Sequence, residues 1–293
     1  WTMTMMAATI VLTRVISAEA IFGAITEHRV THFAGAPIVL AMLVNAPEAQ
    51  RPKLDYTVKA FTAGAPPPAA ILQKMSEMGF DVMQVYGLTE TYGHVTQCVW
   101  REEWDELGFE AQADLQSWQG VGFPMQEGAA VMNTESGELV PRDGETQGEI
   151  VLRGNAVMKG YYKDPDATKA ALHDGWFFSG DAAVWHDNGY IQIKDRLKDV
   201  IISGGENISS VEVEGYLYRH PSVAAAAVVA KPDEKWGEVP CAFVELKQGE
   251  SVSEAEFLEW CRGEMAGFKR PKQVIFGELP KTSMTLSVLR HAC

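Results

Sequence analysis

An aromatic ring, a small residue, a hydroxyl and a carboxylate fall within five positions at Tyr86-Gly87-Leu88-Thr89-Glu90. The stretch follows an apolar run that predicts a strand, and α/β proteins place ligands at the carboxyl ends of parallel strands. The ring can stack on a base, the hydroxyl can donate to a phosphate oxygen, and the carboxylate can hold Mg²⁺ together with substrate phosphates. The stretch alone leaves open an ordinary strand-to-loop turn that carries a surface glutamate.

Three other stretches contain residue types that suit a nucleotide. Residues 62–66 are small, so a planar ligand can lie against their backbone. Asp181, in the sequence Ser179-Gly180-Asp181, can accept hydrogen bonds from two vicinal ribose hydroxyls, as acidic residues do in nucleotide-binding folds. Arg196 can bridge to the same ribose or to a phosphate. Taken one at a time, these stretches are better explained as turns and a solvated surface charge.

Taken together, the stretches resemble the acyl-adenylate-forming (AMP-binding) superfamily, which includes acyl-CoA synthetases, luciferases and peptide-synthetase adenylation domains. The motifs that match, in the family's order, are residues 31–37, 64–66, 86–90, 179–181, 195–199 and 203–207. The resemblance covers essentially the whole chain. It is closest to the medium-chain acyl-CoA and methylmercaptopropionate–CoA ligase branch, judged from residues 35–39 and 202–210, and it implies an acid–thiol ligase.

The resemblance implies a role for each nucleotide-facing residue. The nucleotide would be held by seven residues of these motifs: Gly64, Ala65, Pro66, Tyr86, Gly87, Asp181 and Arg196. The Tyr86 ring would stack on the adenine and Asp181 would grip the ribose, so we expect these two side chains to border one cleft. Thr89 and Glu90 would be catalytic, with Thr89 contacting the phosphate and Glu90 holding Mg²⁺.

The resemblance also implies a mobile second lobe. Lys198 would be the hinge about which this lobe swings between an adenylating and a thioester-forming pose, and Gly204 and Gly205 would face the pantetheine arm of coenzyme A. In the implied reaction, a fatty or short- to medium-chain carboxylate attacks the α-phosphate of ATP, and the thiol of coenzyme A then displaces AMP. The first step develops negative charge on phosphate, so it needs cations and backbone donors aimed there.

Two parts of the family pattern are missing from this sequence. The Ser/Thr/Gly-rich phosphate loop is absent because Trp1 matches a family position downstream of it, so we expect an N-terminally truncated chain. Leu286 takes the place of the family's C-terminal catalytic lysine, and loss of one such cation costs roughly a hundred-fold or more in rate.

These departures leave three hypotheses. The chain is a fragment of an acyl-CoA ligase that functions only in its complete form. Alternatively, it is a catalytically defective chain that binds nucleotide or coenzyme A. It could also belong to another adenylating class, such as a luciferase-like or carrier-protein-loading enzyme. The turn at residues 203–207 favours coenzyme A over a carrier protein.

Composition narrows the class of partner and the compartment. The 293 residues are 46% apolar and carry a net charge of −14, which disfavours nucleic acid or an anionic membrane surface as main partner. The four cysteines lie far apart without a C-x-x-C pair, so we expect reduced thiols and a cytoplasmic location. No apolar run approaches the length of a membrane span. The oligomeric state is left open.

The elements that must position the motifs change in character along the chain, which predicts an α/β plus α+β fold. Residues 1–118 predict the C-terminal part of a large parallel α/β subdomain, residues 119–195 a small antiparallel β-barrel subdomain, and residues 196–293 a smaller mobile α+β lid domain with its hinge at 195–199. The acidic, Trp-containing segment 101–117 predicts a surface excursion.

Local signals predict where individual elements begin and end. Helices are expected at 18–28, 69–78, 209–218 and 253–265, with Ser17 and either Ser209 or Ser210 as N-caps and Gly79 as a terminator. Strands are expected at 30–34, 58–62, 81–86, 129–132, 148–153, 182–185, 190–194, 224–230, 241–246 and 273–276.

Overall fold

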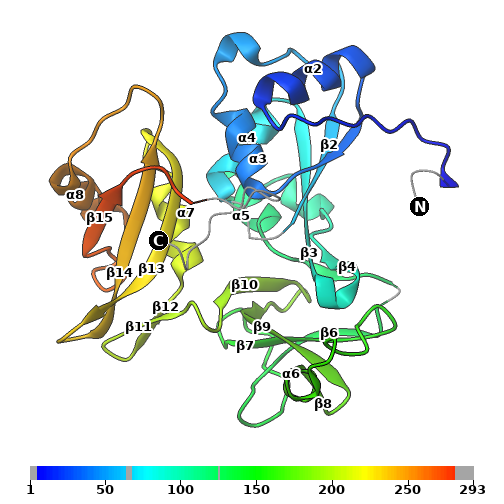
Figure 1. The fold of residues 1–293 in the computed structure, drawn as a ribbon, viewed down its shortest axis with the longest axis vertical. Helices are drawn as coiled ribbons and strands as arrows, with labels where there is room; N and C mark the ends of the chain where they lie inside the picture. The colour runs from blue at the N-terminus through cyan, green and yellow to red at the C-terminus, as the bar shows by residue number, and fades with distance from the viewer. Residues whose placement is uncertain (1–4, 64–67, 125, 281–293) are drawn as a thin grey trace.

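The computed structural model describes residues 5–63, 68–124 and 126–280 (Figure 1). These residues form three five-stranded sheets, each with helices packed beside it, and three main hydrophobic clusters. The mixed α/β and α+β fold expected from the sequence is therefore confirmed. Within the described ranges, none of the helices combines the length and the apolar character needed to cross a membrane.

The first sheet has the strand order β1-β2-β3-β4-β5, with β1, β2 and β3 parallel and β4 antiparallel to β3. Its strands are β1 (His32–Ala34), β2 (Val58–Thr62), β3 (Phe80–Leu88), β4 (Gly93–Gln97) and β5 (Val121–Gly122). Its helices are α2 (Ala18–His28), α3 (Pro37–Val44), α4 (Ala69–Glu77) and α5 (Phe109–Gln116), with short 3₁₀ turns at Glu48–Gln50, Thr89–Thr91 and Glu102–Trp104. The parallel β2–α4–β3 crossover places the carboxyl end of β3, with Tyr86, at one edge of the core.

The second sheet is antiparallel and curls below the first one (Figure 1). It has the order β10-β9-β7-β6, with β8 paired to β9. The elements are β6 (Gly128–Met132), β7 (Gly148–Arg153), α6 (Pro165–Ala171), β8 (Leu172–His173), β9 (Trp176–Trp185) and β10 (Ile191–Arg196). Tyr86 and Val95 of the first sheet belong to this sheet's hydrophobic cluster, so the two sheets share a core.

The third sheet, with its two helices, stands to one side of the other two (Figure 1). It has the order β12-β11-β14-β13, with β15 parallel to β14. The elements are β11 (Ile201–Ser203), β12 (Glu206–Ile208), α7 (Ser210–Leu217), β13 (Val223–Asp233), β14 (Gly237–Leu246), α8 (Glu254–Glu264) and β15 (Gln273–Phe276). Helix α7 contacts β10, and strand β13 contacts α3, so both elements of this layer face the rest of the chain.

The cap residues of two helices were predicted correctly. Ser17 accepts a hydrogen bond from the Ala20 N–H at 3.2 Å, and Ser209 accepts one from the Glu212 N–H at 3.0 Å. Gly79 has φ +88°, a left-handed conformation that glycine adopts without the strain of a Cβ. These signals act within one helical turn, so the sequence alone is sufficient to find them.

The prediction of a surface excursion at residues 101–117 was wrong in part. Trp104 is only 5% exposed and packs edge-on against Tyr190, and α5 packs on α4. Helix α3 was not predicted, because its sequence Pro-Ile-Val-Leu-Ala-Met-Leu-Val is apolar on every face and has no amphipathic period. Burial decided the structure of both segments. The acidic composition of residues 101–117 and the missing period of α3 gave no signal for it.

Candidate functional site

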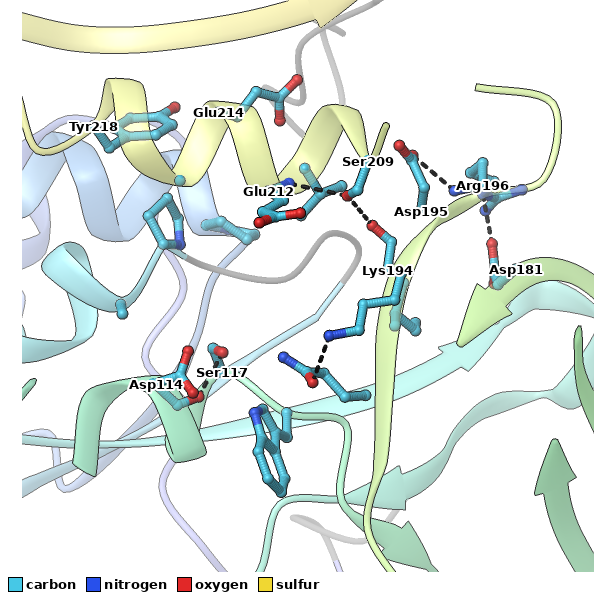
Figure 2. A pocket seen from close by; sticks show the side chains of 18 of the residues that line it. Asp114, Ser117, Asp181, Lys194, Asp195, Arg196, Ser209, Glu212, Glu214 and Tyr218 are labelled. Atoms are coloured by element: carbon cyan, nitrogen blue, oxygen red, sulfur yellow. Dashed lines mark hydrogen bonds and ion pairs between the residues drawn. The ribbon is translucent and has the colours of Figure 1, made fainter. Parts of the chain in front are cut away.

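A cavity of about 950 Å³ lies where the three layers meet. Its wall takes residues from the end of β3, from β9 and β10, and from the faces of α3 and α7 that point inward. The residues that border the cavity include Ile38, Tyr86, Gly87, Asp181, Lys194, Asp195, Arg196, Lys198, Ser209, Glu212, Gly215 and Arg219. Figure 2 shows α7 along one side of this cavity and β10 along another. Five of the residues named from sequence, from β3 to the segment after β10, therefore border one space.

Tyr86, Asp181 and Arg196 form a bonded cluster in the cavity wall. The Tyr86 hydroxyl donates to Asp181 Oδ2 at 2.7 Å, and Arg196 Nε lies 2.8 Å from Asp181 Oδ1 (Figure 2 shows the Arg196–Asp181 pair). Arg196 is opposite Asp181 in the β9–β10 register, which makes the two cross-strand neighbours. The expectation that Tyr86 and Asp181 border one cleft is met by direct contact.

Burial controls the protonation of this cluster. The Asp181 side chain is 5% exposed, and burial raises the pKa of its carboxyl, while the Tyr86 hydroxyl and the Arg196 charge oppose that rise. The Arg196 side chain is 47% exposed, so it keeps contact with solvent. Burial, followed by the nearby Asp181 charge, raises the pKa of Tyr86 well above its usual value. Tyr86 is therefore a neutral donor at physiological pH, and Asp181 keeps lone pairs for a further ligand.

Gly87 is required by a close approach of two backbones. A Cβ on Gly87 would lie 1.9 Å from the carbonyl oxygen of Gly93 and 2.5 Å from Cα of His94. The register of β3 and β4 shifts between Tyr86 and Gly87, so a bulge lies at this point. Bulges of this kind re-aim side chains beside functional sites.

Thr89 and Glu90 lie on the short 3₁₀ turn that follows β3. Thr89 is exposed, Glu90 is half-buried, and neither borders the cavity among the residues that the structure describes. Glu90 Oε1 accepts a hydrogen bond from the Tyr161 hydroxyl at 3.0 Å. Across the described ranges, no three His, Cys, Asp or Glu side chains gather as a metal-binding group. A single carboxylate can still hold Mg²⁺ when substrate phosphates supply the other ligands, so Glu90 fits that ion.

The remaining sequence-predicted residues lie elsewhere. Gly64, Ala65 and Pro66 are outside the described residues, as is Leu286. Gly204 and Gly205 form the β11–β12 turn with φ +60° and +90°, and of the described residues they are not among those that border the cavity. Lys198 borders the cavity on the segment between β10 and β11.

The sequence did not point to the contacts between the third layer and the rest of the chain, which we call the seam. The Ser209 hydroxyl donates to the Lys194 carbonyl, and the Ser210 N–H donates to Asp195 Oδ2 at 2.5 Å. Asp195 is 1% exposed. Because its carboxylate accepts from the first N–H of α7, Asp195 of β10 helps to cap that helix. Figure 2 shows Ser209 reaching from α7 towards the strand that carries Lys194.

Two further contacts cross the seam at its edges. Arg219 lies 3.7 Å from Glu110 of α5, with side chains 48% and 83% exposed. Ile38 of α3 packs against a small apolar cluster of the third layer that includes Ala225, Ala227 and Leu279. Cap and strand signals were present at Ser209 and Lys194, but nothing local in the sequence pairs them.

Comparisons with known proteins agree on one family. The AMP-binding enzyme family matches residues 1–162, and the AMP-binding enzyme C-terminal domain matches residues 212–284. An acetate–CoA ligase of Humulus lupulus is 51% identical over 298 residues, which is 99% of this chain and 52% of that protein. A 2-methylpropanoate–CoA ligase of the same plant is 52% identical over 287 residues, 97% of this chain and 51% of that protein. The chain thus spans about half the length of the curated relatives it matches.

Solved structures show the same likeness. The ATP-bound structure of MatB from Rhodopseudomonas palustris superposes with a TM-score of 0.82 at 28% identity, over 97% of this chain and 54% of that chain. An anthranilate–CoA ligase in complex with anthranoyl-AMP gives a TM-score of 0.80 at 25% identity, over 97% of this chain and 54% of that chain.

Proposed function

The chain belongs to the AMP-binding enzyme family, and on that premise we propose that it is the nucleotide-gripping part of an AMP-forming acyl-CoA ligase. The complete activity would be ATP-dependent conversion of a carboxylate to an acyl-adenylate and then to a coenzyme A thioester. The two Humulus lupulus relatives are named for acetate and 2-methylpropanoate, and an Arabidopsis thaliana relative that is 48% identical over 297 residues is named for acetate or butyrate. We therefore propose a short aliphatic carboxylate as the substrate. We also propose a cytoplasmic location, although one Arabidopsis thaliana relative is named peroxisomal.

The Tyr86–Asp181–Arg196 cluster is the observation that carries this proposal. Asp181 would accept hydrogen bonds from the ribose hydroxyls, with Arg196 holding its charge and Tyr86 fixing its orientation. A buried carboxylate is stabilised when its acceptor sites are hydrogen-bonded. The two hydroxyls of a ribose diol could donate to the lone pairs of Asp181 that Tyr86 and Arg196 leave open. Gly64, Ala65, Pro66 and Gly87 would lie against the base.

Two residues of the turn that follows β3 would serve the phosphates. Thr89 would donate to the α-phosphate, and Glu90 would hold Mg²⁺, which supplies charge neutralisation when bound. In the first step a carboxylate oxygen bonds to the α-phosphorus while the bond to pyrophosphate breaks. In the second step the sulfur of coenzyme A bonds to the acyl carbon, AMP leaves, and the thiol proton passes to solvent.

We propose that the third layer acts as the mobile part. Residues 1–118, 119–195 and 196–293 would be the three domains, with Lys198 as the hinge at residues 195–199. Gly204 and Gly205 would face the pantetheine arm once the layer has turned. Gly204 and Gly205 are not among the described residues that border the cavity. This would fit an adenylating pose, from which the third layer turns to bring the two glycines to the pantetheine arm.

A second candidate function is nucleotide or coenzyme A binding without adenylation. It is favoured by Leu286, which stands where the family has a lysine, because leucine cannot hold a carboxylate or a phosphate. If this candidate is right, the chain should release no pyrophosphate from ATP and a short carboxylate. Pyrophosphate release at a rate that Asp181→Asn abolishes would reject this second candidate.

Calorimetric titration with AMP tests the proposed function. We expect the chain to bind AMP, and we expect Asp181→Asn to weaken binding by roughly ten-fold or more, because a charged acceptor contributes about 1.5–3 kcal/mol. Asp143→Asn, an exposed turn aspartate, is the matched control and should bind AMP as the unmodified chain does. Equal AMP affinity in the unmodified chain and in Asp181→Asn would contradict the proposal.

A further inference from the structure

The turn that carries Asp181 is a bulge in strand β9. Glu149 of β7 is opposite Ala182, and Val151 is opposite Phe178. Three residues of β9, Ser179 to Asp181, therefore face Ile150 alone. The bulge includes Gly180 at φ +76°, a left-handed conformation that suits glycine. Without this bulge Asp181 would stay in strand register, and its side-chain direction would follow the pleat of the sheet.

Four backbone groups at the bulge have partners outside the β7–β9 ladder. The Gly180 N–H donates to Glu149 Oε1 at 2.7 Å, and the Gly180 carbonyl accepts from the Leu197 N–H at 2.9 Å. The Ser179 hydroxyl donates to the Ile150 carbonyl at 2.8 Å and accepts from the Asp181 N–H at 3.1 Å. Two side chains, Glu149 and Ser179, thus fix the direction of the peptide units on either side of Gly180.

A glutamate is energetically unfavourable at position 149, because its carboxylate is buried there. Strand β7 buries four consecutive residues from Glu149 to Leu152, and Glu149 is 7% exposed. Burial raises the pKa of its carboxyl, the Gly180 N–H opposes that rise, and the Asp181 charge reinforces it. An apolar side chain would avoid both the desolvation and the repulsion from Asp181. The hydrogen bond to Gly180 is the contact that such a side chain could not make.

We propose that Glu149 is a positioning residue, which holds the Ser179–Asp181 bulge so that the Asp181 carboxylate is aimed at the ribose hydroxyls of the nucleotide. The inference rests on the proposed function and deepens it. Glu149 does not border the cavity among the described residues, so it acts through the Gly180 peptide and not by touching the ligand. Ser179 shares the task by holding the next peptide unit, between Gly180 and Asp181.

The test compares AMP with 2′,3′-dideoxy-AMP, which lacks the diol. Calorimetric titration should show the unmodified chain binding AMP about ten-fold or more tightly than the dideoxy compound. In Glu149→Leu the preference should fall to about two-fold or less, while Glu149→Gln, which retains an oxygen for the Gly180 N–H, should keep it. Ser179→Ala should lose the preference in the same direction. Glu138→Gln, an exposed carboxylate near the same sheet, is the control and should leave the preference unchanged.

A purely structural role predicts a different pattern. Glu149→Leu would then lower the melting temperature and leave the preference for AMP over the dideoxy compound intact, and that result overturns the inference. A chain that binds neither compound counts against the proposed function. The crystal structure of Glu149→Leu then decides the positioning role separately. Loss of the 2.7 Å contact between Tyr86 and Asp181 supports that role, and an unchanged contact overturns it.

Discussion

The pocket floor and the seam are built in contrasting ways. We use pocket floor for Tyr86, Gly87, Asp181 and Arg196 together with the Glu149-supported bulge. The floor joins the first two sheets through buried side chains and a shared core. Among the described residues, the seam joins the third layer to them through hydrogen bonds from Ser209 and Ser210 to Lys194 and Asp195, an exposed ion pair and a small apolar cluster.

The difference teaches which part of the molecule can move. Buried, mutually bonded groups are costly to separate, whereas exposed pairs contribute little. The seam has buried bonds as well, between Asp195 and Ser210, and these lie close to Lys198 in the sequence. We therefore expect the floor and these bonds to hold their geometry, and the exposed Arg219–Glu110 pair to open, when the third layer changes its orientation about the segment that contains Lys198. This is the mechanical requirement of a hinge at a domain border.

The largest difference in stability between floor and seam should come from adding one methyl group to each. Gly87→Ala forces the β3 and β4 backbones apart, since the new Cβ would lie 1.9 Å from the Gly93 oxygen, and overpacking of this kind costs about 1–3 kcal/mol or more. Gly215→Ala on α7 meets nothing within 4 Å and should stabilise the helix by about 0.5–1 kcal/mol. Urea unfolding of both variants measures the contrast. Equal shifts of the two midpoints would remove the distinction between floor and seam.

Removing one hydroxyl from the floor should have an intermediate effect. Tyr86→Phe leaves Asp181 Oδ2 without its donor in a side chain that is 5% exposed, which should lower the free energy of unfolding by about 1–3 kcal/mol. Tyr92→Phe is the control, because Tyr92 is 89% exposed and should change stability by no more than about 0.5 kcal/mol. If Tyr86→Phe proves as mild as its control, the bond to Asp181 contributes nothing to the floor.

The smallest effect should come from the ion pair at the edge of the seam. Glu110→Gln removes the charge that faces Arg219 and should cost about 0.2–1 kcal/mol, declining further in about 1 M salt, where exposed charges are screened. Glu106→Gln, an exposed carboxylate on the preceding turn, is the matched control. Chemical denaturation at low and high salt measures both. A loss larger than about 2 kcal/mol that persists in salt would show the seam to be as firmly held as the floor.

The sequence alone was a good guide wherever the deciding contacts are local. The Ser17 and Ser209 caps bond within one helical turn, and the strand at Val58–Thr62 has the bounds expected from the sequence. It was a poor guide where burial decides. Helix α3 is apolar on every face, and Trp104 sits in an acidic segment yet is buried against Tyr190. Neither environment is visible in a window of neighbouring residues.

For the site, the sequence motifs identified the residues, and the fold determined which of them contact one another. The sequence by itself determined the family, the order of its motifs and the residues that suit a nucleotide, because residue type and spacing along one segment are enough for that. Only the tertiary structure decided that Tyr86 and Asp181, 95 positions apart, share a hydrogen bond, and that Glu149 holds the peptide beside Asp181. Such contacts depend on strand register and on bulges, and these are settled when sheets pair and pack and not by any one stretch of chain.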